Sequence, residues 1–407
     1  MAIIRPFRAL RPAPAAAAAV AAVPYDVVST REARRLVADN PLSFLHVSRA
    51  EIDLPDGADP YGQAVYERAA RNLKALAERA PLVVDPEPAL YLYRMQAGGH
   101  EQIGLAGCFS LDEYDRDVIK RHERTRRDKE DDRTRHMVAL RAQTGIVFLA
   151  YRATAGLDDA VDEGAAEAPL LDVAAPDGVR HSVWRLSPEA TRAAAGAFAD
   201  VPAVYIADGH HRIASAARAR DELAGGDPQH EACFFLGVAF PDRQTRILPY
   251  NRTVADLASR TAAEFLDALR ARFPVAAAGP PVPPKGRIAM YLEGAWYTIE
   301  PAGVGAAGGT GAPAARLDAA ILQDRILAPL LDVADIRTDP RVGFVGGARG
   351  VAALEQAVDS GAAAVAFSLA AVTPDELLAV SDAGGIMPPK STWFEPKLRD
   401  GLLIHTI

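Results

Sequence analysis

The chain has 407 residues, of which 49% are hydrophobic and 24% charged, and its formal net charge is −8. This composition is that of a folded globular protein and excludes a disordered or collagen-like chain, while the length exceeds the size at which one core usually stops growing. The acid excess argues against a nucleic-acid partner, because neutralising phosphates needs concentrated Lys and Arg.

Cysteine content and hydropathy indicate the compartment. The two cysteines, Cys108 and Cys233, both lie in apolar runs, which excludes a disulfide framework and fits a reducing environment. No run of about 18 apolar residues is present, because the one candidate near the start, residues 15–23, is short and dominated by alanine. We therefore expect a cytoplasmic protein without a membrane partner.

The first 155 residues predict strands and helices in mixed order. Residues 3–10 predict a strand, and Ser29 with Glu32 forms a capping-box pattern that predicts a helix to about Asp39. Apolar spacing predicts a second helix over 61–78, and alternation around Gly98-Gly99 predicts a hairpin over 89–109. The charged run 120–135 predicts a helix that continues to Leu140, followed by a buried strand over 145–152.

The central residues predict a strand, a loop and a helix in succession. An acidic stretch at 161–169 predicts a surface excursion, and a short strand is expected near 181–186. Residues 203–207 predict a strand that stops at Asp208-Gly209, and 213–223 are unbroken helix formers. A strand over 232–240 and a helix over 263–273 follow.

A glycine- and alanine-rich stretch at 303–313 predicts a linker before the last part of the chain. Beyond it the pattern predicts a helix over 318–331, strands near 343–345 and 364–367, and a final helix that begins at Thr373-Pro374. The fold class expected is therefore α/β with mixed sheets, in three regions: 1–155, 156–302 and 314–407.

The segment Asp208-Gly209-His210-His211-Arg212 carries the strongest chemical signal. The start of a helix presents free backbone N–H groups and the positive end of the helix dipole, which suits an anion. His210, His211 and the Arg212 guanidinium could bind phosphate oxygens, and Asp208 could hold a divalent cation or accept a proton. The alternative is that Asp208 only caps the helix and Arg212 pairs on the surface.

Two further segments carry polar groups that could contact phosphate. His122-Glu123-Arg124-Thr125 is expected on the charged helix, where a Glu–Arg ion pair is as good an explanation as catalysis, and its spacing does not match a zinc motif. Residues 387–397 combine prolines with Lys390, Ser391, Thr392 and Lys397, which could neutralise phosphate and donate to it, or form a strap that closes the fold. The sequence has no Walker motif, no GxGxxG motif after a predicted strand and no GxSxG motif.

Three stretches, RHERTRRDKEDDR, IADGHHRIASA and MPPKSTWFEPKL, in this order resemble a bacterial and archaeal domain-of-unknown-function family over nearly the whole chain. The early VPYDVVS segment resembles the opening of that family. The DGHHR segment is also similar to the phosphate-binding loop of the ParB and sulfiredoxin-like group, which includes free-serine kinases. The chain departs from those kinases by placing about two hundred residues before the loop.

The kinase resemblance implies a phosphotransferase that uses ATP or ADP with Mg²⁺ to phosphorylate the hydroxyl of a small metabolite, such as L-serine. It implies donor and catalytic roles for the loop and a base early in the chain, where Glu32 is in a comparable place. Asp208 or Glu123 would hold the metal or accept the hydroxyl proton, and His211 is a further catalytic candidate. The expected phosphate contacts are Gly209, His210, Arg212, His122, Arg124, Thr125, Lys390, Ser391 and Thr392.

Two other functions stay open at this point. The same His, Asp and Glu residues would suit a metal-dependent phosphatase or nucleotide hydrolase with water as the nucleophile. A non-catalytic nucleotide-binding regulator of ParB type would bind without turnover. A homodimer is compatible with all three functions.

Overall fold

The computed structural model describes residues 2–79, 81–301 and 312–407. The described chain forms two compact units: unit 1 runs to Arg121, resumes over Thr125–Thr245 and ends with Pro396–Ile407, and unit 2 contains His122–Arg124 and Arg246–Glu395. These boundaries differ from the three expected regions because one sheet of unit 1 takes strands from both sides of residue 155. The expected linker at 303–313 lies almost entirely outside the described residues.

Unit 1 is built on a nine-stranded mixed sheet in the order β6-β11-β8-β12-β5-β4-β10-β9, with β1 paired to β5. Two small strand pairs, β2 with β3 and β7 with β21, accompany it. The strands are β1 (Ile4–Arg5), β2 (Leu10–Pro12), β3 (Leu82–Val84), β4 (Tyr91–Ala97), β5 (His100–Ser110), β6 (Ile119–Lys120), β7 (Ala142–Gln143), β8 (Val147–Tyr151), β9 (Leu171–Ala174), β10 (Arg180–Arg185), β11 (Val204–Asp208), β12 (Phe234–Pro241) and β21 (His405–Thr406).

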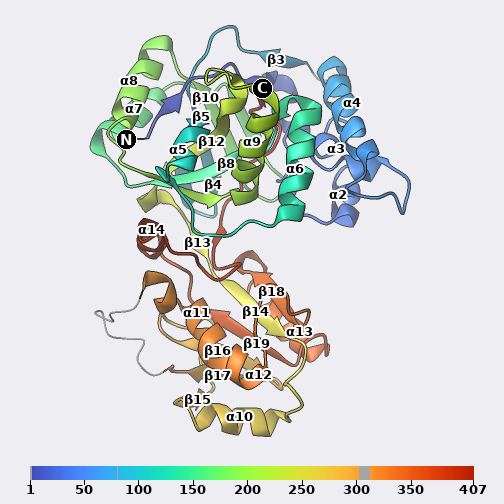
Figure 1. The fold of residues 1–407 in the computed structure, drawn as a ribbon, viewed down its shortest axis with the longest axis vertical. Coiled ribbons are helices and arrows are strands. Elements are labelled where there is room, and N and C mark those ends of the chain that lie inside the picture. The colour runs from blue at the N-terminus through green and yellow to red at the C-terminus, as the bar shows by residue number, and fades with distance from the viewer. Residues whose placement is uncertain (1, 80, 302–311) are drawn as a thin grey trace. The chain divides into compact units, whose positions relative to one another are not determined.

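Helices cover this sheet, and α6 packs along α9 (Figure 1). The α-helices of unit 1 are α1 (Ala17–Val20), α2 (Thr30–Leu36), α3 (Leu45–Ser48), α4 (Gln63–Arg79), α5 (Leu111–Asp115), α6 (Arg127–Leu140), α7 (Ala155–Gly164), α8 (Pro188–Phe198) and α9 (His210–Leu223). Short 3₁₀ turns are η1 (Pro14–Ala16), η2 (Ala50–Asp53), η3 (Glu231–Cys233) and η4 (Asp242–Gln244).

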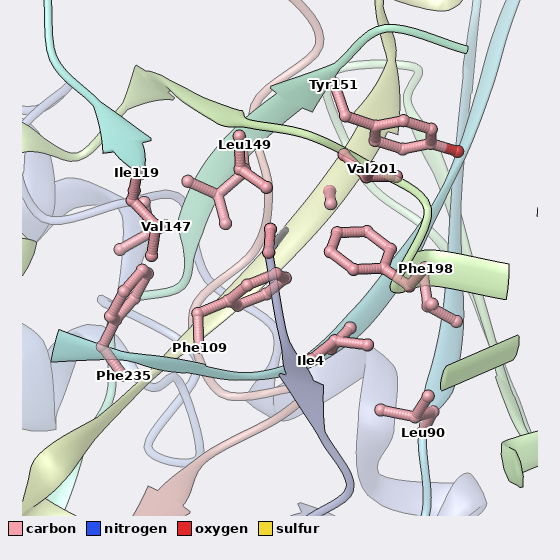
Figure 2. Close-up of a cluster of buried hydrophobic side chains, with 14 of the residues drawn as sticks. Ile4, Leu90, Phe109, Ile119, Val147, Leu149, Tyr151, Phe198, Val201 and Phe235 are labelled. Atoms are coloured by element: carbon pink, nitrogen blue, oxygen red, sulfur yellow. The ribbon is translucent and has the colours of Figure 1, made fainter. Parts of the chain in front are cut away.

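The main core of unit 1 joins side chains from strands far apart in the sequence. Figure 2 shows Phe109, Leu149 and Phe235 from neighbouring strands packed with Phe198 from α8. Phe109 stacks on Phe235 with ring centroids 5.7 Å apart. Burial of large apolar side chains contributes about 1.5–3 kcal/mol each, so this cluster fixes the position of β8, next to which β11 pairs.

Unit 2 contains a six-stranded sheet in the order β15-β17-β16-β19-β14-β18 and the pair β13 with β20. Its strands are β13 (Ile247–Leu248), β14 (Tyr250–Val254), β15 (Val275–Ala277), β16 (Ile288–Leu292), β17 (Ala295–Ile299), β18 (Val342–Gly346), β19 (Val365–Leu369) and β20 (Trp393–Phe394). The helical segments are α10 (Ala262–Arg270), η5 (Pro313–Arg316), α11 (Asp318–Leu322), the π-helical turn η6 (Gln323–Leu327), α12 (Ala328–Leu331), η7 (Gly347–Arg349), α13 (Ala352–Asp359) and α14 (Pro374–Asp382).

Much of the expected secondary structure is confirmed, and so is the mixed α/β class. The Ser29–Glu32 capping box begins α2, and the hairpin β4–β5 turns at Gly98 and Gly99 with φ of 55° and 80°. Positive φ at both positions is what a two-residue hairpin turn requires. Among the described residues, no helix is both long and apolar enough to cross a membrane.

The expected helix over 120–135 is wrong in its first part. Residues 119–120 form β6, and α6 begins only at Arg127, so His122–Thr125 lie in an extended connection and not on a helix. The charged composition predicted a helix, but pairing of β6 with β11 takes Ile119 into the sheet, where it is fully buried. Burial of Ile119 in the sheet outweighs the helix preference of the residues that follow, because tertiary packing overrides intrinsic propensity.

Candidate functional site

The turn between β11 and α9 lies at an edge of the unit 1 sheet. β11 ends at Asp208, Gly209 has a φ of 105°, and α9 begins at once with His210, three residues earlier than expected from the sequence. A side chain at Gly209 would be strained at this φ. Because β6 and β11 are parallel, their carboxyl ends lie at the same edge of the sheet.

The first turn of α9 has no side-chain cap. Gly209 occupies the N-cap position and makes no side-chain cap bond to the first amides, and no acidic residue lies in the first turn. The backbone N–H groups of a helix start carry partial positive charge and need an acceptor. Anion binding by these amides, which the sequence predicts, stays a prediction.

Asp208 forms an ion pair with Lys397 from the C-terminal segment. The Lys397 ammonium donates to Asp208 Oδ2 at 2.7 Å, and both side chains are mostly buried. Burial disfavours the charged carboxylate, but Lys397 and Arg212 favour it more strongly, so the pKa of Asp208 lies below its ordinary value. Asp208 is thus a permanently ionised carboxylate, which suits a cation ligand better than a proton acceptor.

Arg212 points into the unit and is held there. Its guanidinium pairs with Asp26 at 2.9 Å, donates to the Ile146 carbonyl at 2.7 Å and lies 5.6 Å from the centre of the Tyr25 ring. Burial lowers the pKa of Arg212, but Asp26 and Asp208 raise it further, and the net shift is upward. Only 4% of the residue is exposed, so the alternative of a surface pair is wrong.

The two histidines of the turn differ in their surroundings. The backbone N–H of Arg126 donates to His211 Nε2 at 3.0 Å, so this nitrogen is an acceptor and is not protonated. The bond ties the start of α6 to the start of α9, directly after Thr125, whose hydroxyl donates to Glu130. His210 is buried, with 7% exposed.

Asp400 adds a second carboxyl group near Arg212. Its backbone pairs with Ala22 in both directions, and the residue is 2% exposed. Burial raises the pKa of Asp400 to about 7, against the opposing influence of Arg212 and with the help of Asp26. Unlike Asp208, this carboxyl group changes its charge near neutral pH.

The other two motifs meet inside unit 2. The backbone N–H of Met387 donates to the His122 carbonyl at 2.8 Å, and the Thr392 hydroxyl lies 3.5 Å from His122 Nε2. Glu123 and Arg124 line a cavity of about 400 Å³ together with Met387. The structure therefore brings together two segments that are more than 250 residues apart in the sequence.

A buried arginine supports the loop at 388–390. Arg252 donates to the Pro389 carbonyl at 3.0 Å and to the Tyr250 carbonyl at 2.8 Å, and burial lowers the pKa of Arg252 to about 10. Lys390 has a φ of 57°, and its ammonium lies 5.8 Å from the centre of the Tyr250 ring. The Ser391 hydroxyl donates to the Pro388 carbonyl at 2.6 Å, so this loop is tightly braced.

Glu32 has a local structural role. Its carboxylate accepts from the Ser29 backbone N–H at 2.8 Å and from the Ser29 hydroxyl at 2.7 Å, which completes the capping box of α2. A base role for Glu32 stays a prediction.

Sequence reasoning missed Tyr25, Asp26 and Asp400, which lie near Arg212 in unit 1, and Arg252, which supports the loop at 388–390 in unit 2. Tyr25 and Asp26 lie in the VPYDVVS segment, which was singled out for its resemblance and not for its chemistry. The Tyr-Asp pair between Pro24 and Val27 was the available signal. Nothing local to Asp400 distinguishes it from a surface aspartate.

A family model described as "Protein of unknown function (DUF1015)" matches residues 4–320, more than three quarters of the chain. No curated protein matches the sequence.

Solved structures similar to the chain include three whose sequences have low identity to it. A free serine kinase in complex with AMP is 13% identical with a TM-score of 0.37, covering 73% of this chain and 91% of its own. SbnI with C-terminal truncation from Staphylococcus aureus is 11% identical with a TM-score of 0.40, covering 74% and 87%. A conserved hypothetical protein from Pyrococcus furiosus is 14% identical with a TM-score of 0.35, covering 73% and 94%.

Proposed function

Since the chain belongs to the DUF1015 family, whose description assigns no activity, we propose its function from the site itself: a nucleotide-dependent phosphotransferase that acts on the hydroxyl of a small metabolite. One observation carries the proposal. The first turn of α9 begins at a positive-φ glycine without any side-chain cap, beside the ionised Asp208 and the Lys397 ammonium. Phosphoryl transfer depends on positioning and on charge stabilisation, and this turn supplies groups for both.

Each residue of the turn has a distinct role in the proposal. The amides of the first turn of α9 and the His210 ring bind phosphate oxygens of the donor. Lys397 lies close enough to Asp208 to share its charge with a bound phosphate, and Arg212 is a positioning residue that holds the turn through Asp26 and Ile146. His211 orients the start of α6 through Arg126.

The charge of Asp208 fits a divalent cation. Mg²⁺ is commonly held by one or two carboxylates together with substrate phosphates, and Asp208 is ionised with one oxygen, Oδ1, outside its bond to Lys397. Such an ion would neutralise charge on the donor phosphates. Asp208 would be its ligand in unit 1, and a metal or base role for Glu123 stays a separate prediction.

The reaction moves one phosphoryl group and one proton. The acceptor oxygen bonds to the terminal phosphorus of the donor while the bond from that phosphorus to the bridging oxygen breaks, and the hydroxyl proton passes to a base. The lowered pKa of Asp208 makes it a poor base. Glu123 and Glu32 are the carboxylates to test for that step.

Purified protein is incubated with ATP, ADP or pyrophosphate, with Mg²⁺, and with a panel of hydroxyl metabolites that begins with L-serine. Mass spectrometry should detect a phosphorylated acceptor formed in equal amount to the donor consumed. Donor loss without a phosphorylated acceptor would indicate the nucleotide hydrolase instead.

Variants locate the activity. D208N and H210A should lower kcat/KM by about a hundredfold or more, because each removes a group next to the donor phosphates. The matched control is R220A, at the far end of α9, where Arg220 pairs with Asp115 and Asp221. Full activity in D208N and H210A would contradict the assignment of the turn.

A non-catalytic nucleotide-binding protein is the second candidate. It is favoured because Arg212 and His211 already form bonds within unit 1. These two side chains are therefore better suited to shaping a binding site than to taking part in a reaction. Saturable ADP binding in calorimetry, together with no product from any donor and acceptor pair, would establish it.

A further inference from the structure

A basic cavity lies in unit 1, in a part of the sequence that carries no motif. It has a volume of about 370 Å³ and is bounded by α4 on one side and by the segment from Pro41 to Asp53, which includes α3 and η2, on the other. These elements are packed together within unit 1 (Figure 1). The residues of the α9 turn are not among those that line this cavity.

Arginines of α4 give the cavity its charge. Arg68, Arg71 and Arg79 all line it, and their spacing of three and eight residues places them on one face of the helix. In the described ranges of the chain, no carboxylate lies within 4.0 Å of any of the three guanidinium groups. Three neighbouring cations that form no ion pair with the described residues and share the cavity with the single carboxylate of Asp53 repel each other, so an anion bound between them would be stabilised.

The wall opposite α4 holds a histidine whose orientation is fixed. His46 Nδ1 is bonded to Asp53 at 2.8 Å, and Asn72 donates to both the His46 carbonyl and Asp53 Oδ2 at 2.6 and 2.7 Å. The bond to Asp53 raises the pKa of His46, against burial. This arrangement fixes the ring with Nδ1–H donating to Asp53, and the raised pKa favours the charged ring, in which Nε2 also carries a proton.

Two buried donors at the cavity have no acceptor within the described chain. They are His46 Nε2 and Arg68 Nε, each shielded from solvent without a hydrogen-bond partner. A buried donor left unsatisfied costs about 1–3 kcal/mol, so such atoms mark where a ligand oxygen is expected. They are independent of the excess of positive charge and indicate the same ligand.

We propose that this cavity binds a small phosphate monoester, with the phosphate between Arg68, Arg79 and His46. Arginine forks match phosphate oxygens, and the site has more positive charge than Asp53 can balance. Val47 and Leu76 give the cavity an apolar wall, against which a short carbon skeleton can pack. The volume suits a metabolite of a few carbons.

The inference goes beyond the proposed function and does not depend on it. The α9 turn would hold the donor and perform the transfer, whereas this cavity would hold a phosphorylated metabolite in a separate place. Binding at the cavity can therefore be measured in a protein that turns nothing over.

Isothermal titration calorimetry on the full chain tests the proposal with glycerol 3-phosphate and inorganic phosphate as probes and glycerol as the uncharged control. Glycerol 3-phosphate should bind, and R68Q and R79Q should each weaken its Kd by about tenfold or more. The matched control is K74Q, because Lys74 is on α4 but does not line the cavity. R79Q serves as the second variant because Arg79 is exposed and its replacement should not disturb folding.

Each titration is repeated with H210A, which weakens any phosphate site at the α9 turn. Binding that survives H210A and is lost in R68Q and R79Q supports the cavity. Absence of binding by both probes, equal binding by R68Q and wild type, or loss of binding only in H210A overturns it. Binding of inorganic phosphate without glycerol 3-phosphate overturns the assignment of an ester.

Discussion

The helices α9 and α14 both begin at a sharp turn, but their first turns are satisfied in different ways. At α14 the Thr373 hydroxyl accepts from the Glu376 N–H at 3.2 Å and the Glu376 carboxylate accepts from the Thr373 N–H at 2.9 Å. At α9 the N-cap is Gly209. The charged side chains on either side of it have distant partners: Arg212 pairs with Asp26, 186 residues away, and Asp208 pairs with Lys397, 189 residues away.

The difference distinguishes a helix N-terminus that only stabilises the fold, at α14, from one that can also bind a ligand, at α9. The capping box of α14 satisfies the backbone N–H groups of Thr373 and Glu376 within four residues. The start of α9 has no side-chain cap from its N-cap residue and depends on distant residues for its shape. The N-terminus of α14 is therefore stabilised by neighbouring residues, and that of α9 by residues far away in the sequence. Four substitutions test this contrast.

The largest effect is expected for K397A. Removing the ammonium leaves Asp208 as a mostly buried charge, which should lower the free energy of unfolding by about 3 kcal/mol. Because the pKa of Asp208 is lowered in the folded protein, the pair stabilises above the ordinary pKa of an aspartate, and the difference between wild type and variant should shrink as pH falls below about 4.

Urea unfolding at several pH values measures this. R220A is the control and should change the free energy of unfolding by less than about 0.5 kcal/mol, since its ion pairs are exposed. A pH-independent loss in K397A would show that Lys397 acts by packing and not by charge.

G209A should cost about 2 kcal/mol, because alanine at a φ of 105° is strained and its Cβ would meet Val147 and Arg212 at 3.4 Å. G156A is the matched control: Gly156 lies in α7 with open space around a Cβ, and alanine there should be neutral or stabilising. Thermal unfolding of both variants decides. An equal change in stability in the two variants would mean that position 209 does not require glycine.

D400N should stabilise the protein at pH 8 by about 1.5 kcal/mol and have little effect at pH 4. Burial raises the pKa of Asp400 to about 7, so the folded state holds its proton more tightly than the unfolded state and loses stability as pH rises from about 4 to about 7. The asparagine has no charge to bury. Unfolding curves at the two pH values give the comparison, and a stabilisation equal at both would refute titration of Asp400 as the cause.

T373A gives the smallest effect, a loss of about 1 kcal/mol from one helix cap. T373S keeps the hydroxyl and should restore most of it. Neither change should alter nucleotide binding, whereas G209A should weaken it. A loss of nucleotide binding in T373A would contradict the proposal that the N-terminus of α9, and not that of α14, binds the ligand.

Local signals in the sequence predicted local structure well. The Ser29–Glu32 box, the Gly98-Gly99 hairpin and the strand-loop-helix at Asp208 depend on neighbours within a few residues, and all are confirmed. The failure at His122–Thr125 has the opposite origin, because the strand β6 that displaces the helix exists only through pairing with β11, some 85 residues later.

The site itself was predictable only in part. The motif 208–212 could be read from its residue types, but its partners could not, because Asp26 and Lys397 become neighbours of the turn only in the folded chain. The role of Arg212 changed for the same reason. Its type predicted a phosphate contact, and its bonds to Asp26 and Ile146 give it a positioning role.

The last segment of the chain, 396–407, has a consequence for synthesis. It supplies β21 to β7, the backbone partner of Leu10 and the counter-ion of Asp208, all in unit 1. The ribosome synthesises these residues after the whole of unit 2, so unit 1 cannot complete its folding until unit 2 has been translated. A nascent chain that has not yet released this segment cannot form the ion pair between Lys397 and Asp208.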